Sequence, residues 1–586
     1  MQNIGVMEAG MDTSKCKRSA AVIRILAWFL TAAGLIKALF ISLDIDESYL
    51  VACAYRIVNG DRLFLDMWEP HQLASLIPSV FVKIFLSLTG STEGIVLALR
   101  FIGVFIHLSI GIIFYFFLRK KTHRYFAEFL LLIHINFLPK WVQSLDFELM
   151  AYWALLCICM LLLSAGEKEK GSLIKCVAAG VLLTVSMLSY PSYILLYPVF
   201  AAGILICSGK RMSKVCGFTA GAFFTGILVI GILLGNFPAS DLYKNISGIF
   251  LNPSHATKTL SEKLISYAAD GIKGLVIWGA ITIPGYIISG KILKIKDKKY
   301  RLAAASLLAF IALQTAMIAG CVFFNTNQFY LQGRYAALIF SGSVIMISRA
   351  GDKMYRKLLW FAVIPGITAV ISVMAVTNMN ASAAWSKAMP AVYAAIYCLW
   401  NEYSAVRTEE KNDGKSRVFI LSSVSAVFLL AGLFVCRLIL IRVTGCLPVT
   451  VMAPLGRVDK GPAKGLYIAE DFAVTFNSEY DDLAGVYSEN EKVLYVGAEM
   501  LTYLDHPCII ASPSTEGTTV YDEYFISYFE KFPERKPDIV VYDKNYTIVP
   551  EYRRYPSEYV IDEWISENCT EIIKDTPDFV ILRCDR

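Results

Sequence analysis

Apolar residues occur along this chain in long blocks that are separated by short polar segments. Blocks such as Ala21–Leu43 and Val418–Ile441 are about 20 residues long, enough for a helix to cross a hydrocarbon layer roughly 30 Å thick. The pattern predicts a polytopic all-α membrane protein with about 13 transmembrane helices in a lipid bilayer. The expected spans are 21–42, 94–118, 125–139, 149–165, 172–189, 191–207, 215–236, 270–290, 302–323, 335–349, 357–376, 388–405 and 418–441.

The basic residues give these spans an orientation. About 26 of the 42 Lys and Arg before residue 445 lie in alternate loops or at their edges, and such loops are cytoplasmic by the positive-inside rule. We therefore expect a cytoplasmic N-terminal tail, residues 1–20, and an extracytoplasmic C-terminus. The apolar run 73–90 would invert every later loop if it were a span. It is predicted to be an interfacial or re-entrant helix on the outer face.

Composition changes after the last span. The chain is 56% hydrophobic and only 18% charged, with a mean hydropathy of +0.54, whereas soluble chains are about 25% charged. Residues 445–586 hold 13 Lys and Arg against 26 Asp and Glu, which gives them a net charge of −13. Because the whole chain has a net charge of +6, the N-terminal tail and the membrane module 21–444 together carry +19. Short runs such as Val493–Val496 and Ile539–Tyr542 alternate with amphipathic stretches such as Tyr521–Phe532. We predict a small extracytoplasmic α/β domain over 445–586.

Cysteine spacing gives little further information. No CxxC pair and no Cys/His cluster in the sequence suggests a metal site. Four cysteines follow the last span, and their spacing does not indicate which of them pair. They are Cys446, Cys508, Cys569 and Cys584.

The first outer loop, 43–93, begins with three carboxylates, Asp44, Asp46 and Glu47. Partial burial and like-charged neighbours at a membrane boundary raise the basicity of a carboxylate, so one of these acids could take a proton from a substrate hydroxyl. They could equally mark the solvated start of a loop. Asp44-Ile45-Asp46 also matches the Asp-x-Asp motif that holds a divalent metal on nucleotide sugars. That alternative is not favoured, because nucleotide sugars are cytoplasmic and this loop is predicted to lie outside.

The run from Asp46 through Arg100 resembles the first outer loop of the glycosyltransferase-C superfamily, which includes protein O-mannosyltransferases and the lipid A aminoarabinose transferase. Thirteen spans followed by an outer C-terminal domain are also typical of that superfamily. The matching features are Asp46-Glu47, Ala54-Tyr55-Arg56-Ile57, Asn59-Gly60-Asp61, Trp68-Glu69-Pro70, Gly90, Arg100, Asp146, Tyr190-Pro191-Ser192 and Gly333-Arg334-Tyr335.

This resemblance implies an inverting membrane glycosyltransferase. It would move a sugar from a polyprenyl-phosphate donor to an unknown glycan, protein or lipid acceptor outside the cytoplasm, without a cofactor and without a nucleic acid partner. The resemblance makes Asp46 the base, with Glu47 beside it, and Asp146 a second acid that orients the acceptor. The chain departs from the pattern at Glu69-Pro70-His71-Gln72-Leu73, where several relatives have Lys-Pro-Pro-Leu. The lysine that would meet the donor phosphate is missing.

A leaving lipid phosphate in a low-dielectric site needs positive charge placed in advance. Arg334, beside Tyr335 at the head of a predicted span, is the first candidate, although an arginine there could simply extend to the interface. Arg100 could meet the phosphate or pair with an acid of the loop. Lys258 and His71 are further candidates.

Two other functions are open on the sequence alone. A membrane transporter or lipid flippase should show paired halves or broken helices with charges near the midplane, and the predicted spans carry few charges and no such symmetry. A non-catalytic scaffold of the same fold is the other. We expect a multi-pass protein of a bacterial plasma membrane, whose C-terminal domain caps the outer cavity or selects the acceptor.

Overall fold

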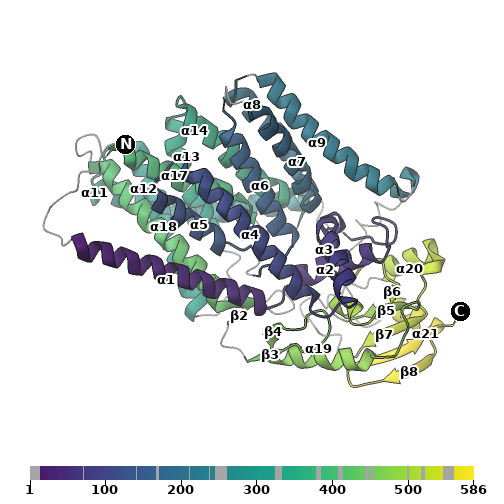
Figure 1. Ribbon diagram of the computed structural model, residues 1–586. Helices are drawn as coiled ribbons and strands as arrows, with labels where there is room; N and C mark the ends of the chain where they lie inside the picture. Colours follow the sequence, from purple (N-terminus) through teal and green to yellow (C-terminus); the bar gives the residue numbers. More distant parts are fainter. Residues whose placement is uncertain are drawn as a thin grey trace.

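The chain forms a bundle of long helices and, at one end of it, a small α/β domain (Figure 1). Helices α2 and α3 lie between these two parts. The computed structural model describes residues 13–69, 71–139, 142–166, 171–209, 211–235, 238–243, 260–323, 333–377, 384–406, 413–442, 448–450, 454–497, 500–515, 522–544 and 560–585.

Every predicted span is helical in the part of the chain that the structure describes. The helices up to the fourth predicted span are α1 (Thr13–Phe40), α2 (Ile45–Val58), the 3-10 turn η1 (Gln72–Ser75), α3 (Leu76–Thr89), α4 (Ile95–Arg119), α5 (Arg124–Asn136) and α6 (Phe147–Ser164). Those that follow are α7 (Ser172–Ser189), η2 (Pro191–Leu195), α8 (Leu196–Cys207), α9 (Arg211–Leu234), α11 (Leu260–Lys291), α12 (Lys298–Phe323), α13 (Arg334–Ser348), α14 (Lys353–Leu358), the π turn η5 (Leu359–Val363), α15 (Ile364–Val376), η6 (Trp385–Ala388), α17 (Met389–Val406) and α18 (Asp413–Ile439).

Length and composition support the membrane assignment. Nine helices among the described residues are long and apolar enough to cross a membrane, and 191–207 and 334–348 form shorter apolar helices. Eight of the nine coincide with predicted spans, and exposed apolar side chains such as Phe29, Phe105 and Phe224 lie on their outer surfaces. The protein is a polytopic helical membrane protein with a small C-terminal α/β region.

The ninth of these helices, Gln72–Thr89, is the apolar run that the charge pattern leaves out of the membrane. The chain contacts the C-terminal domain on both sides of this helix. Before it, the backbone N–H of Trp68 donates to the carbonyl oxygen of Pro513 at 2.9 Å, and after it, that of Gly94 donates to Gly461 at 3.0 Å. Both ends therefore lie on the side of the C-terminal domain, which is the arrangement of an interfacial or a re-entrant helix.

The C-terminal domain is built on a five-stranded sheet with the order β6-β5-β7-β9-β8. Strands β6, β5 and β7 run parallel, and β9 and β8 are antiparallel to their neighbours. Central residues such as Leu494 and Val540 are fully buried, as expected for a sheet covered on both faces. The strands are β5 (Lys492–Val496), β6 (Ile509–Ile510), β7 (Ile539–Asp543), β8 (Glu571–Asp575) and β9 (Phe579–Arg583), and the helices are α19 (Glu470–Leu483), α20 (Asp522–Lys531) and α21 (Val560–Asn568).

Two small ladders complete the domain and connect it to the bundle. Strands β1 (Leu440–Arg442) and β2 (Pro448–Thr450) pair antiparallel, as do β3 (Leu455–Arg457) and β4 (Tyr467–Ala469). The residue after α1, Ile41, forms a bridge with Tyr467. The first turn after α1 is therefore held directly against the domain.

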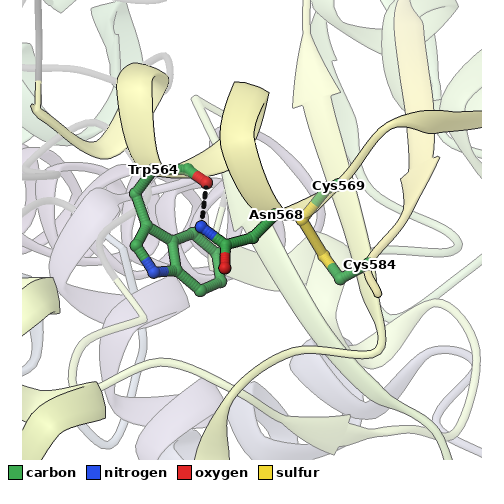
Figure 2. Close-up of a disulfide and its surroundings, with 4 residues drawn as sticks. All are labelled: Trp564, Asn568, Cys569 and Cys584. Atoms are coloured by element: carbon green, nitrogen blue, oxygen red, sulfur yellow. Dashed lines mark hydrogen bonds between the residues drawn. A yellow bond between two sulfur atoms is a disulfide. The ribbon is translucent and has the colours of Figure 1, made fainter. Parts of the chain in front are cut away.

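A disulfide joins Cys569, just after α21, to Cys584 at the end of β9 (Figure 2). Next to it, the side-chain amide of Asn568 donates to the carbonyl oxygen of Trp564 at 2.7 Å. Cys508 is a buried free thiol, and Cys446 lies outside the described residues. The structure thus supplies the pairing that the cysteine spacing left open.

A group of ion pairs fixes the domain to the first outer loop. Asp61 accepts from Arg56 at 2.7 Å and from Arg535 of the C-terminal domain at 2.8 Å. Arg535 also reaches Asp66 at 3.0 Å, which Arg62 holds from the other side at 2.9 Å. Burial favours the neutral form of Asp66, but the hydrogen bonds from Arg62 and the charge of Arg535 outweigh it and lower the pKa of this carboxyl.

Candidate functional site

The three acids at the start of the first outer loop have separate surroundings. Asp44 is buried and caps α2, because its carboxylate accepts the backbone N–H of Asp46 at 3.0 Å. Asp residues are favoured at this position because they satisfy backbone donors of the first helical turn. Glu47 is buried, whereas Asp46 is partly exposed. Of the three carboxylates, Asp46 is the one that solvent or a substrate can reach.

Glu47 forms a buried ion pair with Arg100 of α4. Both guanidinium contacts are short, 2.7 Å from Nε to Oε1 and 2.5 Å from Nη2 to Oε2. Arg100 is fully buried and also donates to the carbonyl oxygens of Leu39 at 3.0 Å and Ser42 at 2.7 Å. It thereby satisfies acceptors at the C-terminal end of α1, where the helix leaves carbonyls without partners.

A second acidic group lies at the N-terminus of α6. Asp146 is buried and caps this helix, accepting the backbone N–H of Leu149 at 2.7 Å and the hydroxyl of Ser144 at 2.6 Å. Two residues further, in the first turn of α6, buried Glu148 forms an ion pair with Lys387 of η6 at 2.7 Å. Two helix starts and η6 therefore place carboxylates and a lysine at the same end of the bundle.

Aromatic rings connect the first loop to this group. The imidazole of His71 stacks on Phe147 with ring centroids 4.2 Å apart, and it meets the edge of Tyr190 at 5.9 Å. The backbone N–H of His71 donates to the hydroxyl of Tyr49, which is on α2 one turn after Asp46. Tyr190 in turn donates to Glu148 at 3.4 Å. The first loop, α6 and the end of α7 thus meet in one cluster. We call it the outer cluster, and it consists of Tyr49, His71, Phe147, Glu148 and Tyr190.

Arg334 is the first residue of α13 and is buried. Its guanidinium lies over the ring of Tyr335, with the carbon of the group 4.5 Å from the ring centroid, and Nη2 donates to the Tyr335 hydroxyl at 3.2 Å. Arg334 therefore lies within the protein, at the start of α13.

A further buried arginine is Arg437, near the end of α18. One of its nitrogens donates to the carbonyl oxygen of Ile135, while Nε and Nη2 are buried and make no hydrogen bond to a described residue. Lys37 of α1 is buried as well. Buried cations in a membrane protein are costly and usually mark a functional site.

The structure thus brings most of the predicted site residues together. Five of them lie where the first loop meets α4 and α6, namely Asp46, Glu47, His71, Arg100 and Asp146. Arg334 and Tyr335 lie at the start of α13, at the same end of the helix bundle. Lys258 lies outside the described residues. The structure adds four charged residues that the motifs do not include, Glu148, Lys387, Lys37 and Arg437. The available signal was a charged residue within five positions of the end of a predicted span.

No family model matches the chain, and no curated protein matches it. Among solved structures, the chain is similar to the Archaeoglobus fulgidus oligosaccharyltransferase in complex with zinc and sulfate, at 14% identity over 89% of this chain and 68% of that chain, with a TM-score of 0.45. The oligosaccharyltransferase AglB of the same organism, in complex with an inhibitory peptide and a dolichol-phosphate, matches at 13% identity over 89% and 70%, with a TM-score of 0.42.

A third similar structure is ArnT from Cupriavidus metallidurans bound to undecaprenyl phosphate. It matches at 13% identity over 96% of this chain and 97% of that chain, with a TM-score of 0.38. At these identities and TM-scores the similarity carries no argument about individual residues, so the role of each residue is argued from its own contacts.

Proposed function

We propose that this protein is an inverting membrane glycosyltransferase that moves a sugar from a polyprenyl-phosphate donor to an acceptor hydroxyl. The observation that carries the proposal is that the three first-loop acids have different surroundings. Asp44 caps α2 and Glu47 pairs with Arg100, while Asp46 is partly exposed beside the outer cluster. A general base must be reachable by the proton that it accepts.

In the proposed reaction, the carboxylate of Asp46 takes the proton of the acceptor hydroxyl. The acceptor oxygen forms its bond to the anomeric carbon while the bond from that carbon to the phosphate oxygen of the carrier breaks. The lipid phosphate leaves with the bonding electrons, and the configuration of the anomeric carbon inverts. Asp146, which is buried and bonded to Ser144, is proposed to help orient the acceptor.

The leaving phosphate needs a cation at this end of the helix bundle. Arg100 and Lys387 are held by Glu47 and Glu148, which makes them poor candidates. Arg334 stays the first candidate because it is buried at the start of α13. Arg437 is a further candidate for this cation, since its Nε and Nη2 are buried without a hydrogen bond to a described residue. Hydrogen bonds from an arginine to a phosphate are strong and often bidentate.

We further propose that the outer cluster and the C-terminal domain face the extracytoplasmic side of a plasma membrane. The disulfide between Cys569 and Cys584 supports this orientation, because disulfides persist in oxidising compartments and are rare in the cytosol. The contacts of the first loop with Arg535 and Pro513 place the C-terminal domain against the outer cluster. From there it could cover the site or select the acceptor.

The test is sugar transfer by purified protein supplied with radiolabelled polyprenyl-phosphate sugars and a membrane extract as the source of acceptor. Asp46→Asn should lower turnover by roughly 10²–10⁴-fold, the usual contribution of a general base, with unchanged expression and thermal unfolding. Asp297→Asn, which changes an exposed acid in the loop before α12, is the matched control and should transfer normally. Full transfer by Asp46→Asn would refute the proposed base.

A chelator distinguishes the Asp-x-Asp alternative from the proposal. Transfer should be insensitive to a chelator of divalent metals if Asp44 acts only as the cap of α2. A loss of transfer that added Mg²⁺ or Mn²⁺ restores would favour a metal on Asp44 and Asp46.

A further inference from the structure

A cavity lies at the other end of the helix bundle, far from the outer cluster. Its volume is about 600 Å³, and it lies between α4, α6, the α14–η5 segment and α17. This volume falls within the roughly 300–1,000 Å³ of ordinary ligand sites. Apolar side chains such as Phe114, Leu156, Met160 and Ala362 form most of its wall.

The position of this cavity follows from the course of α4. The helix begins beside the C-terminal domain, where the backbone N–H of Gly94 donates to Gly461, and it ends at Arg119 after 25 residues. A helix of that length extends about 37 Å, roughly the thickness of a bilayer. Lys121, just after the helix, lines the cavity, so its mouth opens at the membrane face opposite to the C-terminal domain. Figure 1 places α14 at that end as well.

The mouth of the cavity is cationic. Lys121, Lys353 and Lys357 line it, together with one acid, Asp352. The carboxylate of Asp352 caps α14 by accepting the backbone N–H of Met354 at 2.8 Å. Lys357 donates to the carbonyl oxygen of Ala165 at the end of α6 at 3.2 Å. Three positive charges therefore stand against one negative charge at the entrance.

The interior offers little to a polar ligand. The hydroxyl of Tyr393, which lines the cavity, bonds to the hydroxyl of Tyr152 at 2.8 Å, and Tyr152 bonds to His134 at 2.7 Å. These polar groups are thus satisfied within the protein. An apolar cavity with three lysines at its mouth, at the surface of a membrane, is suited to bind an amphiphile that has an anionic head group.

We propose that this cavity binds an anionic phospholipid from the leaflet opposite to the C-terminal domain. An acyl chain would lie along Leu156 and Met160, and the phosphate would be held by Lys121, Lys353 and Lys357. Three lysines beside an apolar cleft favour a lipid over a soluble anion, since burial of the chain adds to the charge attraction. This proposal stands independently of the proposed sugar transfer, because it involves other residues at the other face.

The experiment measures co-purified lipid. The protein is exchanged in mixed vesicles of phosphatidylglycerol and phosphatidylcholine, extracted in detergent, washed, and its retained lipids are counted by mass spectrometry. Wild type should retain phosphatidylglycerol in preference to phosphatidylcholine. The triple variant K121Q/K353Q/K357Q should lose the preference, at about five-fold in affinity for each lysine near a membrane surface. K291Q/K296Q/K298Q removes the same charge from exposed lysines outside the cavity and should behave as wild type.

Two further arms distinguish a phospholipid seated in the cavity from an anion held at its mouth. Met160→Trp should fill the cavity and reduce retention even with all lysines present. Should that variant fail to fold, the lysine triple variant still decides, because its thermal unfolding is measured in parallel. Equal retention of both phospholipids by wild type would overturn the proposal. An equal loss of the preference for phosphatidylglycerol in both triple variants would overturn it as well. Displacement of the lipid by millimolar glycerol phosphate would overturn it too, because the head alone would then be the ligand.

Discussion

Replacing Glu47 should damage the fold, although Glu47 stands next to the proposed base. Its carboxylate makes two contacts of 2.7 and 2.5 Å with Arg100, and Arg100 is fully buried. Glu47→Ala leaves that charge without a counter-ion, and removing one partner of a buried ion pair costs about 3–5 kcal/mol. Asp46 is partly exposed, and a substitution at such a position usually changes stability by about 0.5 kcal/mol or less.

The assay compares thermal unfolding with sugar transfer in purified variants. Glu47→Ala should lower Tm by several degrees, given how Tm responds to changes of this size, and it should lower transfer by reducing the folded fraction. Asp46→Asn should leave Tm unchanged and lower transfer by roughly 10²–10⁴-fold. The double variant Glu47→Leu/Arg100→Met should melt above Glu47→Ala, because replacing both charges by apolar groups removes the unpaired ion.

Two outcomes would refute this prediction. A Glu47→Ala protein with the wild-type Tm would show that the ion pair with Arg100 contributes no net stability. If that protein also lost transfer, Glu47 would be acting on the substrate. A double variant that melts below Glu47→Ala would show that the carbonyl contacts of Arg100 with Leu39 and Ser42 matter more than the charge pair.

Two further predictions concern the C-terminal domain and its contact with the first outer loop. Because Arg62 and Arg535 lower the pKa of Asp66, this carboxylate stabilises the fold at pH values above its unfolded pKa of about 3.9. The difference in Tm between wild type and Asp66→Asn should be full at neutral pH and should shrink as the pH falls below about 4. A difference in Tm that is constant with pH would contradict this prediction. The Cys569–Cys584 disulfide closes a loop with a sequence separation of 15, which is worth about 3 kcal/mol, so Cys569→Ser/Cys584→Ser should unfold at lower temperature and a reductant should reproduce this shift only in wild type.

The pattern of apolar blocks was enough to predict the membrane fold. Each expected span is a helix in the part of the chain that the structure describes, because a segment of about 20 apolar residues in lipid must satisfy its own backbone hydrogen bonds. The motif Asp46-Glu47 and its neighbours predicted the site at which we propose the chemistry, because this run of the sequence resembles the first outer loop of the glycosyltransferase-C superfamily. The net charge of the tail and its alternating strands also predicted the separate α/β domain.

Only the tertiary structure decided which charge pairs with which. Glu47 and Arg100 are 53 residues apart in sequence and meet because α2 packs against α4. Glu148 finds Lys387 in the same way, and the pairing of Cys569 with Cys584 depends on β9 lying beside the end of α21. The composition of a span gives its depth in the membrane but not its rotation or its neighbours, which are set by packing between helices. For that reason the sequence could nominate the acids and cations of the site, while their division into structural pairs and reachable groups followed from the fold.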